Sequence, residues 1–177
     1  MKNRYIFPLI FLLFLAESTL FPWIFPLSWR PVISLTPHFA LAGVLFVGVF
    51  RNRHQGLLYG LIFGFMHDIV HASPMIGAHA FCMALAGYGA GAAADRMKIT
   101  LVKTVLVMFA ALLFYDWAIY ALYRFFRVTF MPFSEMITDF WLPTVLFNLL
   151  FIVSIYVPAR KLLEGKQDKR EEESSGV

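Results

Sequence analysis

The sequence has few charged residues and almost no cysteine. Lys, Arg, Asp and Glu make up 15% of the 177 residues, hydrophobic residues make up 60%, and the mean hydropathy is +0.71. Soluble domains carry about 25% charged residues, so this composition argues against a soluble fold. Cys82 is the single cysteine, which rules out a disulfide within the chain. Phosphate-binding loops and dinucleotide fingerprints are also missing, which argues against an ATPase.

Long apolar runs are what the chain has in abundance. About 20 helical residues cross a hydrocarbon core of roughly 30 Å, and about six such runs are separated by short breaks. Glu17 lies within the first run and Phe-Pro-Trp follows it, which predicts a retained helix rather than a cleaved signal peptide. The predicted spans are Tyr5–Phe25, Val32–Phe50, Gln55–His71, Met75–Ala94, Leu101–Tyr120 and Phe140–Val157.

These runs predict an all-α polytopic membrane protein with about six transmembrane helices. Residues 1–163 are expected to form a single six-helix transmembrane domain, and residues 164–177 a charged, disordered cytoplasmic tail. Of the 15 Lys and Arg residues, Arg30, Arg124 and Arg127 fall on one side, which leaves 12 on the side of both termini. Because Lys and Arg concentrate in cytoplasmic loops, both ends are predicted to lie in the cytoplasm.

Small residues mark one face of the third span and much of the fourth. Glycines four residues apart lie on one helix face and let another helix approach closely, which favours helix association in lipid. We therefore predict that these two spans pack together at the centre of the bundle. The opposite face, with Leu61, Phe65 and Ile69, is expected to meet lipid. The residues predicted for helix packing or partner binding are Gly56, Gly60, Gly64, Gly77, Gly87 and Gly91.

Polar residues inside the spans are candidates for a functional site, because such groups are costly in hydrocarbon. Asp68 needs a partner, which a nearby histidine can supply, and Glu17 is predicted to pair with His38. Asp116 is expected near the outer headgroups with no special role, and Pro37 is expected to kink its helix. Either the cluster opens outward as a site, or it is a buried network that only fixes packing. The candidates are Glu17, His38, His67, Asp68, His71, His79 and Asn148.

The string from His67 to His71 is similar to the HExxH motif of intramembrane zinc proteases, with Asp68 in the glutamate position. Asp is one methylene shorter than Glu, and no second motif supplies a third ligand on another span. His79 is a conceivable third ligand, although a lone histidine on such a helix is more often simply hydrogen-bonded. We therefore predict no metal, no cofactor and no catalytic residue.

The long connection between the last two spans combines aromatic residues with arginine. Such side chains favour the lipid headgroup layer. The segment is predicted to be either an aromatic belt or a docking surface for an external partner. Its candidate residues are Arg124, Phe125, Phe126, Arg127 and Phe130.

Three local features resemble the MreD family of bacterial rod shape-determining proteins. They are Pro37-His38-Phe39, the run from Gly56 to Val70 with its glycine ladder and Asp68, and Gly77 about nine residues further on. The resemblance extends over nearly the whole chain in length, span number and short basic inner loops. His67, His71 and His79 have no counterpart that we can assign in the family.

The resemblance implies a non-enzymatic subunit of the cell-elongation machinery in the bacterial cytoplasmic membrane. Family members bind the bitopic protein MreC, and through it associate with MreB filaments, a SEDS glycosyltransferase and a transpeptidase that extend lateral peptidoglycan. The family fold is similar to the substrate-binding subunits of energy-coupling-factor transporters. A small-molecule-binding subunit of such a transporter is therefore the alternative function.

Overall fold

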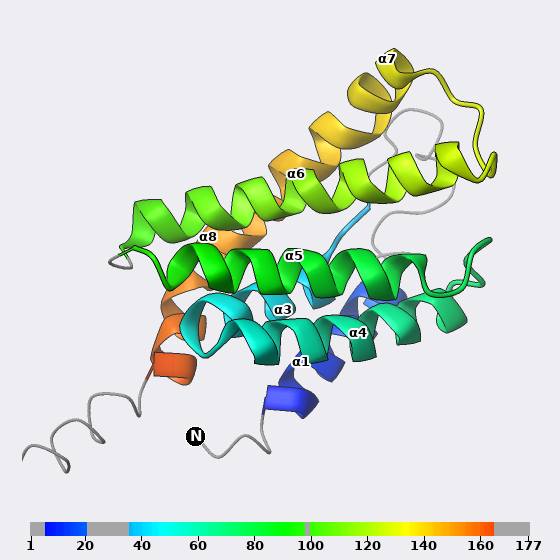
Figure 1. Cartoon of the computed structure of the whole chain (residues 1–177). Helices are drawn as coiled ribbons and strands as arrows, with labels where there is room; N and C mark the ends of the chain where they lie inside the picture. The colour runs from blue at the N-terminus through cyan, green and yellow to red at the C-terminus, as the bar shows by residue number, and fades with distance from the viewer. Residues whose placement is uncertain (1–5, 21–35, 98–99, 165–177) are drawn as a thin grey trace, which may run out of the picture.

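The computed structural model describes residues 6–20, 36–97 and 100–164, and in these residues it is built from six continuous helices without strands (Figure 1). The first helix is α1 (Ile6–Leu15), which continues as the π-helical turn η2 (Ala16–Leu20). The next are α3 (Phe39–Phe50), α4 (Arg53–Val70), α5 (Ala78–Ala94) and α6 (Leu101–Phe125). The last is α7 (Phe133–Glu135), which runs through π-helical η4 (Met136–Trp141) into α8 (Leu142–Glu164).

Each predicted span corresponds to one of these helices. Within the described residues, Leu101–Phe125 and Phe133–Leu163 are long and apolar enough to cross a membrane. Both are longer than predicted, whereas α3 has only 12 residues. The predicted tail beyond Glu164 lies outside the described residues, as do Arg30 and the parts of the first two spans between residues 21 and 35.

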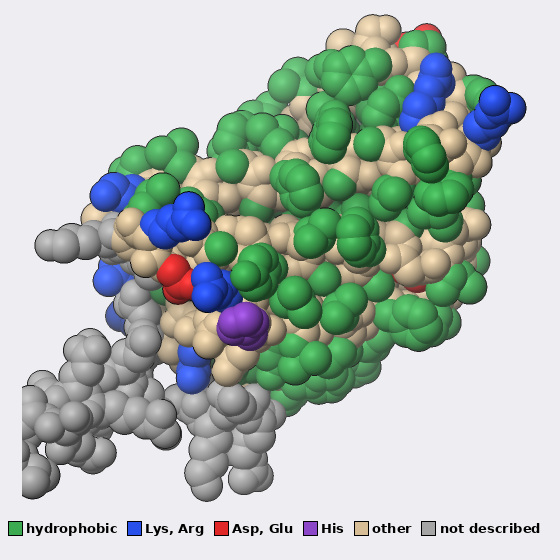
Figure 2. All heavy atoms as spheres, in the orientation of Figure 1, with side chains coloured by type: hydrophobic (Ala, Val, Ile, Leu, Met, Phe, Trp, Pro, Cys, Tyr) green, Lys and Arg blue, Asp and Glu red, His purple; other side chains and the backbone are tan. Residues whose placement is uncertain are grey.

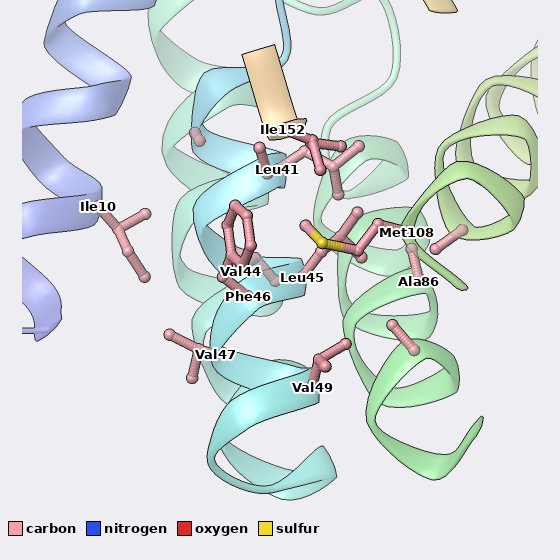
Figure 3. Close-up of a cluster of buried hydrophobic side chains, with 14 of the residues drawn as sticks. Ile10, Leu41, Val44, Leu45, Phe46, Val47, Val49, Ala86, Met108 and Ile152 are labelled. Carbon is pink, nitrogen blue, oxygen red and sulfur yellow. The ribbon is translucent and has the colours of Figure 1, made fainter. Parts of the chain in front are cut away.

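Helix α3 occupies the centre of the bundle, and the prediction that α4 and α5 do so was wrong. All residues from Ala40 to Phe50 are buried. Figure 3 shows the side chains of Leu41, Leu45 and Val49 directed among the surrounding helices, where Met108 approaches from α6. A helix that is apolar on all sides can be buried on every face, which explains why α3 lies at the centre of the bundle.

The predicted contact between α4 and α5 is confirmed, and the two helices form the most closely packed pair. A Cβ atom added to Gly60 would lie 2.6 Å from the carbonyl oxygen of Met83, and one added to Gly56 would lie 2.6 Å from that of Gly87. Gly64 meets the backbone of Ala80 in the same way. The glycine ladder therefore places backbone directly against backbone. The opposite face of α4, including Leu61, Phe65 and Ile69, is exposed as predicted.

The bundle has two ends of different character. The start of α1, the turn between α3 and α4 and the end of α8 lie together at one end, and α7 lies at the other, called here the α7 end (Figure 1). On the face shown in Figure 2, hydrophobic side chains cover the middle and the blue Lys and Arg side chains gather toward the two ends. An apolar middle between charged ends is the pattern that a bilayer requires.

Candidate functional site

All seven predicted polar residues come together at the α7 end of the bundle. They are contributed by η2, the start of α3, the end of α4, the start of α5 and the middle of α8. We call this group, with the addition of Asp116 from α6, the polar cluster. Its members are Glu17, His38, His67, Asp68, His71, His79, Asp116 and Asn148.

Asp68 caps the start of α5. Its side chain is 1% exposed, and its carboxylate accepts hydrogen bonds from the backbone N–H of Gly77 (2.9 Å) and of Ala80 (3.3 Å). His79 Nδ1 lies 2.7 Å from Asp68 Oδ1 and supplies the partner that the sequence predicted. The first N–H groups of a helix have no acceptor within the helix, and the helix dipole favours a negative charge there. Asp68 therefore satisfies the first N–H groups of α5 and stabilises the start of that helix.

Glu17 and Asn148 do the same for α3. Glu17 Oε2 accepts from the backbone N–H of Ala40 (3.0 Å), and Asn148 Oδ1 accepts from that of His38 (2.8 Å). The Asn148 amide also donates to the carbonyl oxygens of Thr36 (3.1 Å) and Thr144 (2.9 Å). Because α3 begins inside the bundle, its first N–H groups require buried acceptors. Glu17 is carried on a π-helical turn, a local change of pitch that is frequent at functional sites.

The predicted pair of Glu17 with His38 was wrong, because each has another partner. Glu17 Oε1 lies 3.6 Å from His67 Nε2, and His38 Nε2 lies 3.3 Å from Asp116 Oδ1. Asp116 was expected among the headgroups, yet only 9% of it is exposed. Pro37 does not kink α3 either, since it precedes the helix, where a proline is well tolerated.

The histidines of α4 and α5 lie in contact with one another. The rings of His67 and His71 stack with centroids 4.1 Å apart, and the rings of His67 and His79 are 4.5 Å apart. Asp68 points to the start of α5, so it is not placed to activate a water between His67 and His71. Among the described residues, no group of three or more His, Cys, Asp or Glu side chains is arranged to hold a metal ion.

The aromatic connection at the α7 end is highly exposed. Phe125 is 79% exposed, Phe126 57% and Phe130 76%. Arg127 adopts a positive φ of 56°, and the turn is closed by a 2.7 Å hydrogen bond from the Val128 N–H to the Tyr123 carbonyl. The turn therefore holds three large aromatic side chains away from the body of the protein.

Several residues of these contacts were not found by sequence reasoning. A Cβ atom added to Gly48 of α3 would clash with the carbonyl oxygen of Gly87 in α5, as one added to Gly56 of α4 would. The helices α3, α4 and α5 therefore approach one another closely at this level. Thr144 accepts from the backbone N–H of Thr36 at 3.2 Å. An isolated glycine in an apolar run is only weak evidence for a close helix contact. Asp116, in contrast, is an acidic residue within a predicted span, and such residues usually face the interior of the bundle and have a partner.

Comparison with known proteins identifies the family. Residues 2–166 match the family described as rod shape-determining protein MreD. The rod shape-determining protein MreD of Bacillus subtilis (strain 168) is 23% identical over 173 residues, which cover 96% of this chain and 99% of that protein. No solved structure matches the chain. The chain therefore belongs to the MreD family of rod shape-determining membrane proteins.

Proposed function

We propose that this protein is a non-enzymatic subunit of the machinery that elongates rod-shaped bacterial cells. In this role it crosses the cytoplasmic membrane about six times with both ends in the cytoplasm. It binds a bitopic MreC-like partner and thereby supports lateral peptidoglycan synthesis with MreB-type filaments, a SEDS glycosyltransferase and a transpeptidase. The observation that carries the proposal is the family match over residues 2–166.

The placement of the chain ends supports this topology. The start of α1 and the end of α8 lie at the same end of the bundle (Figure 1), as an even number of crossings requires. Arg51, Arg96 and Arg53, the first residue of α4, lie at that end, whereas Arg124 and Arg127 belong to the α7 end. The first group would face the cytoplasm, because Lys and Arg are retained on that side.

The arrangement of the polar cluster supports a structural rather than a catalytic use of its carboxylates. Asp68 and Glu17 each accept hydrogen bonds from the first N–H groups of a helix, α5 and α3 respectively. A carboxylate committed to backbone donors is poorly suited to exchange protons with a substrate. The cluster thus fixes where α3 and α5 begin, and with them the shape of the membrane domain.

The exposed phenylalanines at the α7 end are the surface that we assign to the partner. Phe125 and Phe130 are among the most exposed large hydrophobic side chains of the described chain. Aromatic residues, including Phe, and arginine are enriched in protein interfaces, and both kinds lie in this turn. An MreC-like protein crosses the membrane once, so its segment just outside the membrane would meet this turn.

The test is purification of the tagged full-length protein from its native host in mild detergent, followed by mass spectrometry of the retained proteins. Recovery of a bitopic MreC-like chain in stoichiometric amount supports the proposal. The double variant Phe125→Ala/Phe130→Ala should weaken partner binding about 30-fold, at roughly 1 kcal/mol for each aromatic contact, and thereby lower that recovery. Phe81→Ala is the matched control, because Phe81 is a phenylalanine of α5 that is 54% exposed outside this turn.

Other outcomes contradict the proposal. Recovery with an ATPase module and a bound small molecule would instead establish the transporter subunit. Equal recovery of the partner with wild type and with the double variant would remove the aromatic turn from the interface.

A further inference from the structure

A wide apolar groove lies between α5 and α6. Its volume is about 570 Å³, whereas one water molecule takes up about 30 Å³ in the liquid. Small side chains such as those of Ala86 and Ala90 form its buried floor, and the larger side chains of Leu85 and Leu106 stand exposed beside them. Gly89 opens directly onto the groove, since a Cβ atom added to it would meet nothing within 4 Å. The groove therefore has room for a long, thin apolar group.

The groove is about as long as one leaflet of a bilayer is thick. On α6 its lining residues run from Lys103 to Phe114 with the spacing of a single helix face. Eleven steps of 1.5 Å correspond to about 16 Å along the helix. The hydrocarbon core of a bilayer is roughly 30 Å thick, so each leaflet accounts for about 15 Å. This length fits the acyl chain of one lipid, whereas a membrane-spanning partner helix requires about twice as much.

One end of the groove is positively charged. Lys103 is exposed in the first turn of α6, and it is the charged residue among those that line the groove in the described part of the chain. Arg96 is exposed at the same end of the bundle, just beyond α5, while the nearby Asp95 pairs with Arg53 at 3.8 Å. Figure 2 shows Lys and Arg side chains gathered where α5 ends and α6 begins, next to the hydrophobic middle of the protein. An anionic group would therefore find opposite charge at this end.

The start of α6 also suits an anion. The first turn of this helix contains no acidic residue, and the Thr100 side chain makes no capping hydrogen bond. The first N–H groups of a helix have no acceptor within the helix, and together with the helix dipole they attract phosphate. Lys103 belongs to this same turn, so the charge of its side chain and the start of the helix act at one place.

We propose that the groove binds an anionic phospholipid, with one acyl chain along the groove and the phosphate beside Lys103. The ammonium group of Lys103 donates hydrogen bonds to the phosphate oxygens, and such charge-assisted bonds are stronger than neutral ones. A zwitterionic lipid carries its own cation next to the phosphate, which weakens the attraction to Lys103. The assignment of this lipid to the inner leaflet rests on the topology in the proposed function, but the site itself does not require the proposed partner.

The experiment places the purified full-length protein in nanodiscs with equal amounts of phosphatidylglycerol and phosphatidylcholine that carry the same acyl chains. Native mass spectrometry then counts the lipids that the released protein retains. We expect the wild type to retain phosphatidylglycerol in excess. Lys103→Gln should lower the ratio of the two retained lipids about fivefold, the usual effect of one basic residue near an anionic headgroup. Lys161→Gln is the matched control, because Lys161 is an exposed lysine in the last turn of α8 and does not line the groove.

A second variant tests the groove rather than the charge. Gly89→Leu places a branched side chain in the open space between the helices, so it should lower the retention of both lipids without a clash. Its unfolding temperature in lipid-free detergent shows whether the fold is kept. If this variant does not fold, the two lysine variants still decide the question, since both side chains are exposed.

Three results would overturn the proposal. One is equal retention of the two lipids by the wild type. Another is an equal effect of Lys103→Gln and Lys161→Gln, which would indicate only the general charge of this end. The third is a folded Gly89→Leu variant that retains lipid like the wild type but loses a membrane protein during purification from the host, which would assign the groove to a partner helix. The Phe125→Ala/Phe130→Ala variant alters the other end of the bundle, so failure of the proposed function would be seen separately.

Discussion

Replacing Gly60 by alanine tests whether the close contact of α4 and α5 determines the stability of the bundle. The added Cβ atom would lie 2.6 Å from the Met83 carbonyl oxygen and 2.7 Å from the Cα atom of Ala84. Both atoms belong to the backbone of α5, so no side-chain rotation relieves the clash. Restoring an ordinary contact of 3.4 Å requires the helices to separate by about 0.8 Å at this level.

The expected loss follows from two opposing effects. Forcing an extra methyl group into a packed site costs about 1–3 kcal/mol. Alanine has the higher helix propensity, which returns up to about 1 kcal/mol. We therefore expect Gly60→Ala to lower the free energy of unfolding by about 1–2 kcal/mol. For a chain of this size that corresponds to a lower Tm of about 2–8 °C.

The matched control is Gly89→Ala in α5. A Cβ atom added to Gly89 meets nothing within 4 Å, so the same substitution brings the gain in helix propensity without a clash. We expect its Tm to be equal to that of the wild type or slightly higher. The measurement is thermal unfolding of both variants and the wild type in the same detergent. If Gly60→Ala were as stable as Gly89→Ala, the reasoning from backbone contact would be refuted.

Three further substitutions test the starts of α3 and α5. Gly77→Ala should lower the free energy of unfolding by about 1–2 kcal/mol in denaturant unfolding, because φ at Gly77 is +96°, which alanine rarely adopts. The added methyl group meets no atom within 4 Å, so this loss would come from backbone conformation and not from a clash. An unchanged midpoint would contradict that role of backbone conformation. Asn148→Leu should cost about 1–3 kcal/mol in the same assay, since it leaves the His38 N–H buried without an acceptor. Asp68→Asn keeps one acceptor but loses the negative charge at the start of α5, so we expect the free energy of unfolding to fall by about 1–2 kcal/mol. In a complementation assay the cells should keep their normal rod shape. Misshapen cells with a stable protein would indicate a direct functional role of Asp68.

The helices and the closest helix pair were predictable from sequence because they depend on local patterns. Apolar runs between short breaks marked the helices, and the spacing of Gly56, Gly60 and Gly64 marked the face that meets α5. The short length of α3 was not predictable in this way. Its apolar run continues from residues before Pro37, and that proline was interpreted as a kink within a longer helix, although a proline is also a signal for a helix start.

The partners of the polar residues were only partly predictable for a related reason. His79 was correctly placed within reach of Asp68, since the two are only 11 residues apart and joined by a short turn. Glu17 was predicted to pair with His38 because it lies deep in its span, but the contacts of both residues depend on how the helices are rotated. Rotation is set by packing across the whole bundle, which a single sequence pattern does not contain.

The short central helix explains why a membrane domain keeps carboxylates in its interior. A helix that spans the whole bilayer has its unpaired N–H groups at the headgroups, where water satisfies them. Helix α3 starts inside the bundle instead, so its first N–H groups must be met by Glu17 and Asn148. The same need at the start of α5 is met by Asp68. Each carboxylate then requires a neighbouring donor, which His67 and His79 supply. Much of the polar cluster thus follows from where two helices begin.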